Sequence, residues 1–254
     1  MGIEHLLRAS QSPAPDFTPE SAARVAQDRY GLQGECRPLA GERDLNFCLQ
    51  GLDGSRHLLK IWNHAQDSAV IDFLVGVLGH LELSAPNLPV PRVVPTLAGE
   101  GHATAPGDGA CHHAVCLMTW LEGDFLRDAP ATPALFGSLG SSLAQLDRAL
   151  SDFSHAASHR DMLWDVSRAH RLRALLPAVS DAISAGLAET MLDRFETQIL
   201  PTLASLPRHV LHAEFNLDNV LVQPPPESRV CGIIDFGDAL YAPRVCDLAI
   251  ASAY

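Results

Sequence analysis

The chain has 254 residues, of which 47% are hydrophobic and 19% are charged, and its formal net charge is −12 at pH 7. We do not expect so acidic a chain to bind the phosphate backbone of a nucleic acid, and no apolar run reaches the roughly 18 to 20 residues that a membrane span needs. The six cysteines form no CxxC pair and the N-terminus lacks a secretory pattern, so we expect reduced thiols and a cytoplasmic protein.

The first half of the chain has the pattern of a small sheet with two helices. Residues 16–31 predict a helix, with Thr18 as its N-cap, Pro19 at its first position and Gly31 after its last turn. Strand-like segments follow at 36–40, 45–52 and 56–63, and Asp53-Gly54 predicts a hairpin between the last two. The periodicity then predicts a helix at 67–83, an extended connector at 84–95, a loop at 101–110 and a buried strand at 114–121.

The second half is mainly helical. Long amphipathic stretches predict one helix at 132–153 and one or two more at 169–206. Two short apolar strands at 219–223 and 229–236 then flank the loop 224–228. Since the length exceeds the usual range of a single core, we expect two lobes, residues 1–118 and 119–254. The sequence stops at Tyr254 within a helical pattern, so we expect a piece of a longer protein.

Polar side chains interrupt the apolar pattern near the last two strands: His212, Glu214, Asn216, Asp218, Asn219, Asp235 and Asp238. Buried carboxylates are costly unless they are paired, and a divalent metal can offset that cost. Mg²⁺ prefers oxygen ligands and usually takes one or two carboxylates together with substrate phosphates. Asn219 and Asp235 are therefore candidate metal ligands, which leaves Glu214 to orient or deprotonate a hydroxyl group. Lys60, the only lysine of the chain, lies apart from them in an apolar strand.

The order of a lysine on a strand, an acid-x4-Asn loop and an Asp-Phe-Gly segment resembles the arrangement used for phosphoryl transfer by kinases. In detail the chain resembles the aminoglycoside phosphotransferase and choline kinase-like superfamily, and within it the hydroxylysine kinase branch with its bacterial multidomain relatives. The stretches that carry this resemblance read "DLNF" from Asp44, "CLMTWLEG" from Cys116, "HRDMLW" from His159 and "IIDFGDALY" from Ile233. The resemblance implies an α+β, bilobal, protein-kinase-like fold, with a small antiparallel-sheet N-lobe that binds nucleotide and a mainly helical C-lobe.

The resemblance also implies a chemistry, in which ATP and Mg²⁺ lie between the lobes. Lys60 would hold the ATP phosphates, a contact that suits a compact ammonium group better than a planar guanidinium. Met118 to Leu121, with Met118 and Trp120 as the named candidates, would meet the adenine. Asn219 and Asp235 would hold Mg²⁺ and Glu214 would be the catalytic base. The γ-phosphoryl group would pass to a hydroxyl of a small and cationic molecule, first a hydroxylysine-like compound, then another amino alcohol or an aminoglycoside.

Three residues are candidates for acceptor binding, each with a simpler alternative. Asp238 would receive a substrate ammonium, or else would cap a turn. Trp164 and Asp165 would line the acceptor pocket, or else Asp165 would only cap the helix that follows it.

The sequence departs from the family pattern at several positions. The Gly-Asp of the catalytic loop is Ala213-Glu214, and glutamate reaches about 1 Å further than aspartate, an error that can cost about a hundredfold in rate. The helix after Lys60 has no glutamate to pair with it, and Asp72 is the nearest candidate. These departures keep open an alternative, a catalytically weakened or inactive nucleotide- or ligand-binding module of a larger multidomain protein. A fused C-terminal domain such as an aminotransferase is a possible partner.

Overall fold

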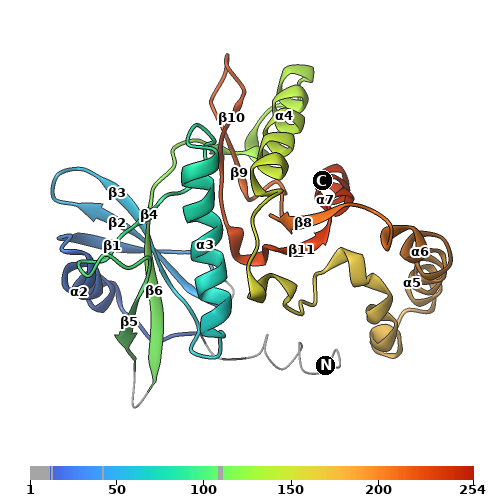
Figure 1. Ribbon diagram of the computed structural model, residues 1–254, viewed down its shortest axis with the longest axis horizontal. Helices are drawn as coiled ribbons and strands as arrows, with labels where there is room; N and C mark the ends of the chain where they lie inside the picture. The colour runs from blue at the N-terminus through green and yellow to red at the C-terminus, as the bar shows by residue number, and fades with distance from the viewer. Residues whose placement is uncertain (1–11, 13, 42, 108–110) are drawn as a thin grey trace.

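The computed structural model describes residues 12, 14–41, 43–107 and 111–254. An antiparallel sheet forms one half of the molecule and a mainly helical region forms the other, with helix α3 (Ser68–Ser84) standing between them (Figure 1). This α+β arrangement confirms the predicted fold class. The expectations for the N-terminus and for residues 108–110 of the predicted loop fall outside the described residues.

The sheet half begins with helix α2 (Pro19–Tyr30), which is capped as predicted. The hydroxyl of Thr18 accepts a hydrogen bond from Ser21 N at 3.2 Å, and Gly31 ends the helix in the left-handed conformation with φ of 72°. The sheet order is β1 (Gly34–Leu39), β2 (Leu45–Gly51), β3 (Arg56–Ile61), β6 (His112–Thr119) and β4 (Val93–Val94). All of its pairs are antiparallel, and the β2–β3 hairpin turns at the predicted Asp53-Gly54.

One segment predicted as a loop is partly a strand. Strand β5 (Ala103–Pro106) pairs antiparallel with β6, with Thr104 opposite Ala114. Its short sequence has no alternating apolar pattern that would predict a strand. The segment is extended because it pairs with β6, so its conformation depends on the tertiary structure.

Helix α3 is apolar on almost every side, as expected for a helix covered by both halves of the molecule. Asp67 caps it by accepting a hydrogen bond from Ala69 N at 2.9 Å, and Phe73, Val77 and Leu81 are fully buried. Its buried side chains share one apolar cluster with the following residues of both halves: Trp62, Met118, Leu146, Leu150, Val210 and Ile233. A domain boundary near residue 118 stays a prediction, and the apolar core is continuous across it.

The helical half contains α4 (Pro133–Leu150), capped by Thr132, and a series of shorter helices. These are η1 (Leu126–Asp128), η2 (Ala156–His159), η3 (Val166–Ala178), α5 (Ala182–Arg194), η4 (Phe195–Ile199), α6 (Leu200–Leu203) and α7 (Val245–Ala253). The apolar stretch at 169–206 is divided after Pro177, and Asp181 caps a new helix there. No helix in the described part of the chain combines the length and the apolar character that crossing a bilayer requires.

Two small antiparallel sheets carry the polar loops. In one of them β9 (Val220–Val222) lies between β10 (Val230–Ile233) and β7 (Asp124–Phe125). In the other, β8 (Arg208–Leu211) pairs with β11 (Leu240–Pro243), and the short helix η5 (Phe236–Asp238) precedes β11. The loop after β8 and the loop after β10 are thereby brought together, because β8 leads into β9 and β10 leads into β11.

Candidate active site

Lys60 lies on β3 as part of an ion pair. Its Nζ is 3.2 Å from Oδ2 of Asp44, and the two side chains retain 13% and 21% of their exposure. The hairpin register explains the pair: Asn46 lies opposite Lys60, and Asp44, two residues earlier, belongs to the same face. The other oxygen of Asp44 accepts a hydrogen bond from Asn63 N at 2.9 Å. Asp44 thus connects the segment before β2 to the end of β3.

The acid partner of Lys60 predicted from sequence is wrong. Asp72 on α3 instead pairs with His102, whose Nε2 lies 2.8 Å from Asp72 Oδ1, and the Asp72 side chain is 59% exposed. The first turns of α3 present this position to solvent, and Asp44 occupies the position beside the ammonium. Sequence reasoning could have found Asp44 from the hairpin register, since it is the acidic residue that alternation places on the same side of the hairpin as Lys60.

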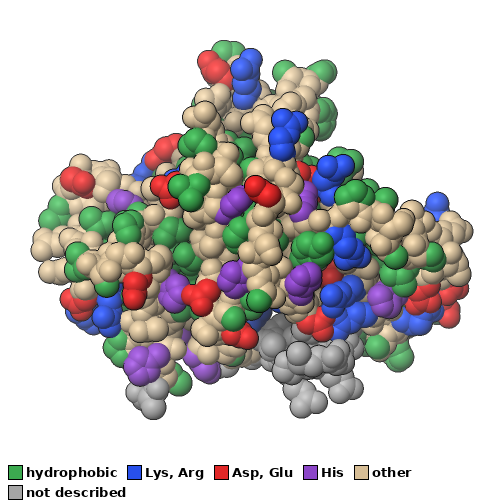
Figure 2. Space-filling model, viewed as in Figure 1, with side chains coloured by type: hydrophobic (Ala, Val, Ile, Leu, Met, Phe, Trp, Pro, Cys, Tyr) green, Lys and Arg blue, Asp and Glu red, His purple; other side chains and the backbone are tan. Residues whose placement is uncertain are grey.

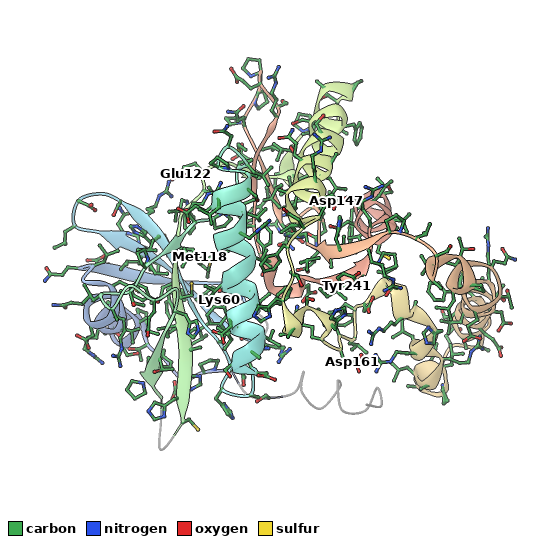
Figure 3. All side chains as sticks on the ribbon, in the orientation of Figure 1. Lys60, Met118, Glu122, Asp147, Asp161 and Tyr241 are labelled. Carbon is green, nitrogen blue, oxygen red and sulfur yellow. The ribbon has the colours of Figure 1, made fainter. Side chains whose placement is uncertain are left out.

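The charge around Lys60 includes acids from the other half of the molecule. Burial lowers the pKa of Lys60, but the negative charges of Asp235 and Asp44 outweigh burial, and the pKa is raised above its ordinary value. The carboxylate of Asp235, which follows β10, therefore lies within electrostatic reach of an ammonium group on β3. Figure 3 shows Lys60 and Met118 on the sheet side of α3, with Tyr241 and Asp161 on the helical side.

The two candidate metal ligands occupy neighbouring positions at the ends of β9 and β10. Ile233 pairs with Val220, and Ile234 N donates to the backbone oxygen of Asn219 at 2.9 Å, so that Asn219 and Asp235 are one residue apart across the ladder. Asn219 is 8% exposed and donates its Nδ2 to Glu214 O at 3.1 Å, which commits its amide nitrogen and leaves its side-chain oxygen as the metal donor. Asp235 has a left-handed backbone with φ of 57°, and its Oδ1 accepts from Gly237 N at 3.1 Å.

This donor set fits a metal that arrives with phosphates. No group of three or more His, Cys, Asp or Glu side chains that could hold a metal occurs among the described residues. One carboxylate and one amide oxygen are too few ligands for a protein-only cage, but they match the usual manner of Mg²⁺ binding, in which substrate phosphates and water complete the octahedron. Asn219 and Asp235 are therefore suited to a metal–nucleotide complex.

The loop from His212 to Asn219 is held in place by backbone hydrogen bonds. His212 is fully buried, its Nδ1 accepts from Glu214 N at 3.2 Å, and its Nε2 contacts Ile234 O at 3.0 Å. Burial lowers the pKa of His212 to about 4, so the ring is neutral and its Nε2 carries the proton that Ile234 O accepts. This bond ties the loop after β8 to the end of β10, so His212 braces the loop.

Ala213, which replaces the family glycine, adopts a positive φ of 64°. A side chain with a Cβ pays roughly 1 to 2 kcal/mol for this conformation. The loop is nevertheless held there by Asp247 of α7, whose Oδ2 accepts from His212 N at 3.1 Å and whose Oδ1 accepts from Ala213 N at 2.7 Å. Sequence analysis did not identify Asp247, which follows the loop by 34 residues.

A second carboxyl group lies behind this loop. Burial raises the pKa of Asp247 to about 7 and that of Asp147, on α4, to about 6, and the two side chains share a hydrogen bond. Two carboxyl groups in contact in a buried site cannot both ionise cheaply, so one of them holds a proton near neutral pH. The anchor of the catalytic loop is thus sensitive to pH.

The predicted base, Glu214, has its main chain fixed by the bonds to His212 and Asn219 described above, and its side chain is half-buried. Its role as a base stays a prediction. Met118 is 7% exposed, belongs to the apolar cluster and pairs with Leu58 and Val93 inside the sheet. Trp120 follows β6 and is half-buried, with the guanidinium of Arg56 5.4 Å from its ring centre. Adenine contacts from Met118 and Trp120 also stay predictions.

The acceptor candidates fare differently from one another. Asp165 is the N-cap of η3: its Oδ1 accepts from Ser167 N at 2.9 Å and from Ser167 Oγ at 2.6 Å. Its side chain is 3% exposed and pairs with Arg168, so the capping alternative is confirmed, and a contact with the acceptor stays a prediction. Trp164 is 66% exposed, and its contact with an acceptor stays a prediction. Asp238 is half-buried, and burial raises its pKa against the opposing charges of Arg160 and Lys60.

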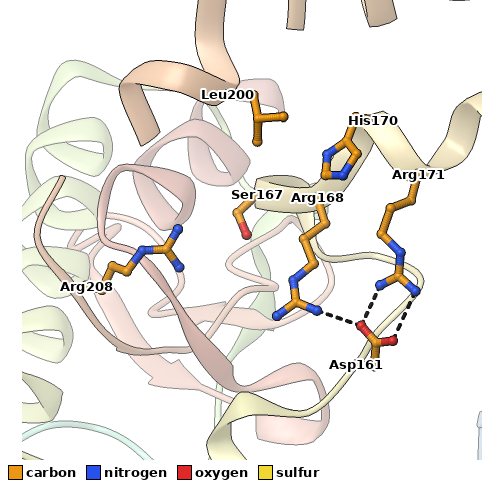
Figure 4. A pocket seen from close by; sticks show the side chains of 7 residues that line it. All are labelled: Asp161, Ser167, Arg168, His170, Arg171, Leu200 and Arg208. Atoms are coloured by element: carbon orange, nitrogen blue, oxygen red, sulfur yellow. Dashed lines mark hydrogen bonds and ion pairs between the residues drawn. The ribbon is translucent and has the colours of Figure 1, made fainter. Parts of the chain in front are cut away.

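A cavity of about 450 Å³ opens beside η3 and contains none of the predicted site residues. Its lining is mainly basic: Asp161, Ser167, Arg168, His170, Arg171, Leu200 and Arg208. Arg168 and Arg171 both bind the carboxylate of Asp161 (Figure 4), and further basic side chains gather on this helical half of the molecule (Figure 2). These two arginines already have an acid partner. The cavity is therefore lined in part by an ion-pair network at the edge of the helical half.

Comparison with known proteins places this geometry in a family. A model of the phosphotransferase enzyme family matches residues 35–254. Hydroxylysine kinase of Danio rerio is 24% identical over 258 residues, which cover 97% of this chain and 72% of that protein. Homoserine kinase of Methylocella silvestris is 28% identical over 242 residues, covering 92% and 70% of the two chains.

Solved structures show the same fold. An amicoumacin kinase in complex with AMP-PNP, Ca²⁺ and amicoumacin superposes with a TM-score of 0.69 at 16% identity, over 98% of this chain and 70% of that one. A microcompartment-associated aminopropanol kinase superposes with a TM-score of 0.69 at 19% identity, over 91% and 73% of the two chains.

Proposed function

This chain belongs to the phosphotransferase enzyme family, and on that premise we propose that it transfers the terminal phosphoryl group of ATP to a hydroxyl group of a small, amino-bearing molecule. The observation that carries the proposal is that the charge of Asp235, in the loop after β10, acts on the ammonium group of Lys60 in the sheet half. Phosphoryl transfer depends mainly on positioning and on compensating the phosphate charge, and an ammonium group facing a metal-ligand pair serves that purpose.

Each residue has a defined task in this proposal. Lys60, held by Asp44, would bind the ATP phosphates, and Asn219 and Asp235 would hold Mg²⁺, which supplies positive charge to the transferring group when bound. Glu214 would accept the proton of the acceptor hydroxyl. The positive φ of Ala213 sets the direction in which the backbone enters Glu214. The reach of the Glu214 side chain toward the hydroxyl therefore depends both on its own length and on the conformation of Ala213.

The acceptor class is inferred from the relatives and from Asp238. A hydroxylysine kinase, a homoserine kinase and an aminopropanol kinase are named for acceptors that carry both a hydroxyl and an amino group. A half-buried carboxylate next to the metal ligands, such as Asp238, is suited to an acceptor ammonium. We place hydroxylysine-like compounds first, then other amino alcohols and aminoglycosides. A fused C-terminal partner and a cytoplasmic location stay predictions.

A transfer assay tests the proposal directly. The purified chain would be given Mg·ATP and a panel of hydroxylysine, homoserine, aminopropanol and an aminoglycoside, with ADP release and acceptor phosphorylation both measured. We expect turnover that Asp235→Ala and Glu214→Ala reduce at least a hundredfold, while Asp193→Ala, on the exposed end of α5, leaves it unchanged. Mg·ATP binding without turnover, unimproved by Glu214→Asp, would instead favour the inactive binding module.

A further inference from the structure

In the part of the chain that the structure describes, two arginines lie near Asp238 without an acid partner of their own. Arg160 follows η2, and its Nη2 donates to the backbone oxygen of Gly237, immediately before Asp238. Arg43 comes from the segment before β2, next to Asp44. The Nε atoms of both arginines are buried and have no hydrogen-bond partner among the described residues. Among the residues that the structure describes, no carboxylate oxygen lies within 4.0 Å of either guanidinium.

The charges of these side chains act on one another. Burial and the charge of Arg43 together lower the pKa of Arg160 to about 10, against the opposing charge of Asp238. The positive charges of Arg160 and Arg43 in turn stabilise the ionised form of Asp238. Two partly buried guanidinium groups and one carboxylate therefore share a small region, and buried charges without close partners are costly. Lys60, Asp235 and Asp44 also contribute charge nearby, so the charges balance in number, but no described acid is close enough to bind either guanidinium directly.

We propose, building on the phosphotransferase function above, that Arg43 and Arg160 bind the carboxylate of the acceptor while Asp238 binds its ammonium, so that the preferred acceptor is a hydroxy-amino acid. An amino acid carries these two groups on one carbon atom, and the bond from Arg160 to Gly237 O keeps the guanidinium beside Asp238 as such a ligand requires. A planar guanidinium matches a carboxylate with two parallel hydrogen bonds.

The origins of the two arginines add a second consequence. Arg43 belongs to the sheet half and Arg160 to the helical half, and Arg43 is adjacent to the acid that holds Lys60. A carboxylate bound between them would connect the segment before β2, which carries Asp44, to the helical half. The same oxyanion chemistry could be supplied by the terminal phosphate of ATP, and the experiment must separate these two sources.

The experiment compares matched acceptors that differ by one carboxylate: homoserine against aminopropanol, and hydroxylysine against its decarboxylated diamine alcohol. For the wild type, Arg160→Gln and Arg43→Gln, kcat and KM are measured for each acceptor and for ATP. The exposed Arg148→Gln on α4 and Arg37→Gln on β1 are the matched controls. Arg160→Lys keeps the charge but loses the paired hydrogen bonds, and thermal unfolding confirms that each variant is folded.

We expect each Gln variant to raise KM for the amino acids about 10- to 100-fold, the usual loss for a charge-assisted contact, and to leave aminopropanol and ATP within about threefold. Arg160→Lys should retain part of the preference, and the control variants all of it. An equal loss for both members of a pair overturns the proposal, and so does a rise confined to the KM of ATP, which assigns the arginines to the phosphate.

The proposal can fail separately from the phosphotransferase function. If the wild type phosphorylates aminopropanol as well as homoserine, the kinase activity holds and the carboxylate site is refuted. If no acceptor is phosphorylated, calorimetric binding of the same acceptor pairs decides: tighter binding of the amino acid that Arg160→Gln removes supports the site, and equal binding overturns it.

Discussion

Replacing Asp44 by asparagine should change the titration of Lys60, whereas the same change at Asp72 should not. Asparagine keeps the oxygen that accepts from Asn63 N, so the substitution removes mainly the charge at 3.2 Å from Nζ. Asp72→Asn is the matched control, because it removes an acid from the position that sequence pattern alone would favour. Asp44→Glu restores the charge on a longer side chain.

The size of the effect follows from the geometry. Two unit charges about 3.2 Å apart attract by roughly 5 kcal/mol at an effective dielectric constant of about 20. Lys60 also keeps Asp235 and Asp238 as neighbours, and these retain part of the stabilisation of its charge. We therefore expect the pKa of Lys60 to fall by about one to two units, equivalent to about 1.4 to 2.7 kcal/mol.

The measurement is unusually direct because Lys60 is the only lysine of the chain. Protein grown on isotope-labelled lysine gives a single side-chain signal by nuclear magnetic resonance, whose pH titration reports this one ammonium group. Since the folded-state pKa of Lys60 is raised, its contribution to stability is complete below the unfolded-state pKa of about 10.5 and is lost as pH rises through the folded value. The stability difference between wild type and Asp44→Asn should accordingly be constant at neutral pH and shrink in strong base.

Lys60 stays protonated at neutral pH in either protein, so any loss of phosphoryl transfer in Asp44→Asn reports its position, not its charge. An unchanged Lys60 titration in Asp44→Asn, or a fall of the same size in Asp72→Asn, would refute the assignment of Asp44 as the partner.

Three further predictions concern the loop after β8. Ala213→Gly should raise the free energy of unfolding by about 1 kcal/mol in a denaturant titration, because glycine adopts the φ of 64° without strain; a loss of stability would contradict this. Asp247→Asn should lower it by about 1 to 3 kcal/mol and reduce turnover, since His212 N and Ala213 N donate to two different oxygens, one of which becomes an NH2 group that cannot accept; unaltered turnover would show that the loop does not need this anchor. Asp147→Asn should change the pH profile: burial raises the folded-state pKa of Asp147 to about 6, so its contribution to stability is complete below about pH 4 and is lost as pH rises through about 6. As pH rises from 4 to 8, the free energy of unfolding of the variant should therefore increase relative to that of the wild type by on the order of 2 kcal/mol, measured by thermal unfolding. If the stability of the two proteins depends on pH in the same way, the two carboxyl groups do not share a proton.

The sequence by itself determined the local features of this protein. The cap residues Thr18 and Pro19, the Asp53-Gly54 turn and the acid-x4-Asn loop each depend on neighbours within a few positions, and the structure has them where the pattern indicated. The family resemblance rests on such short motifs, which is why the kinase-like fold could be expected before any coordinates were known.

Only the tertiary structure decided which distant groups meet. The sequence pattern favours Asp72 as the partner of Lys60, yet the packing of the apolar α3 against both halves leaves Asp72 at the surface. The register of the hairpin instead places Asp44 beside Lys60. The anchoring of the loop by Asp247 likewise depends on where α7 packs. Such contacts are set by how the apolar faces of whole elements fit together, a property summed over the core and absent from any short stretch of sequence.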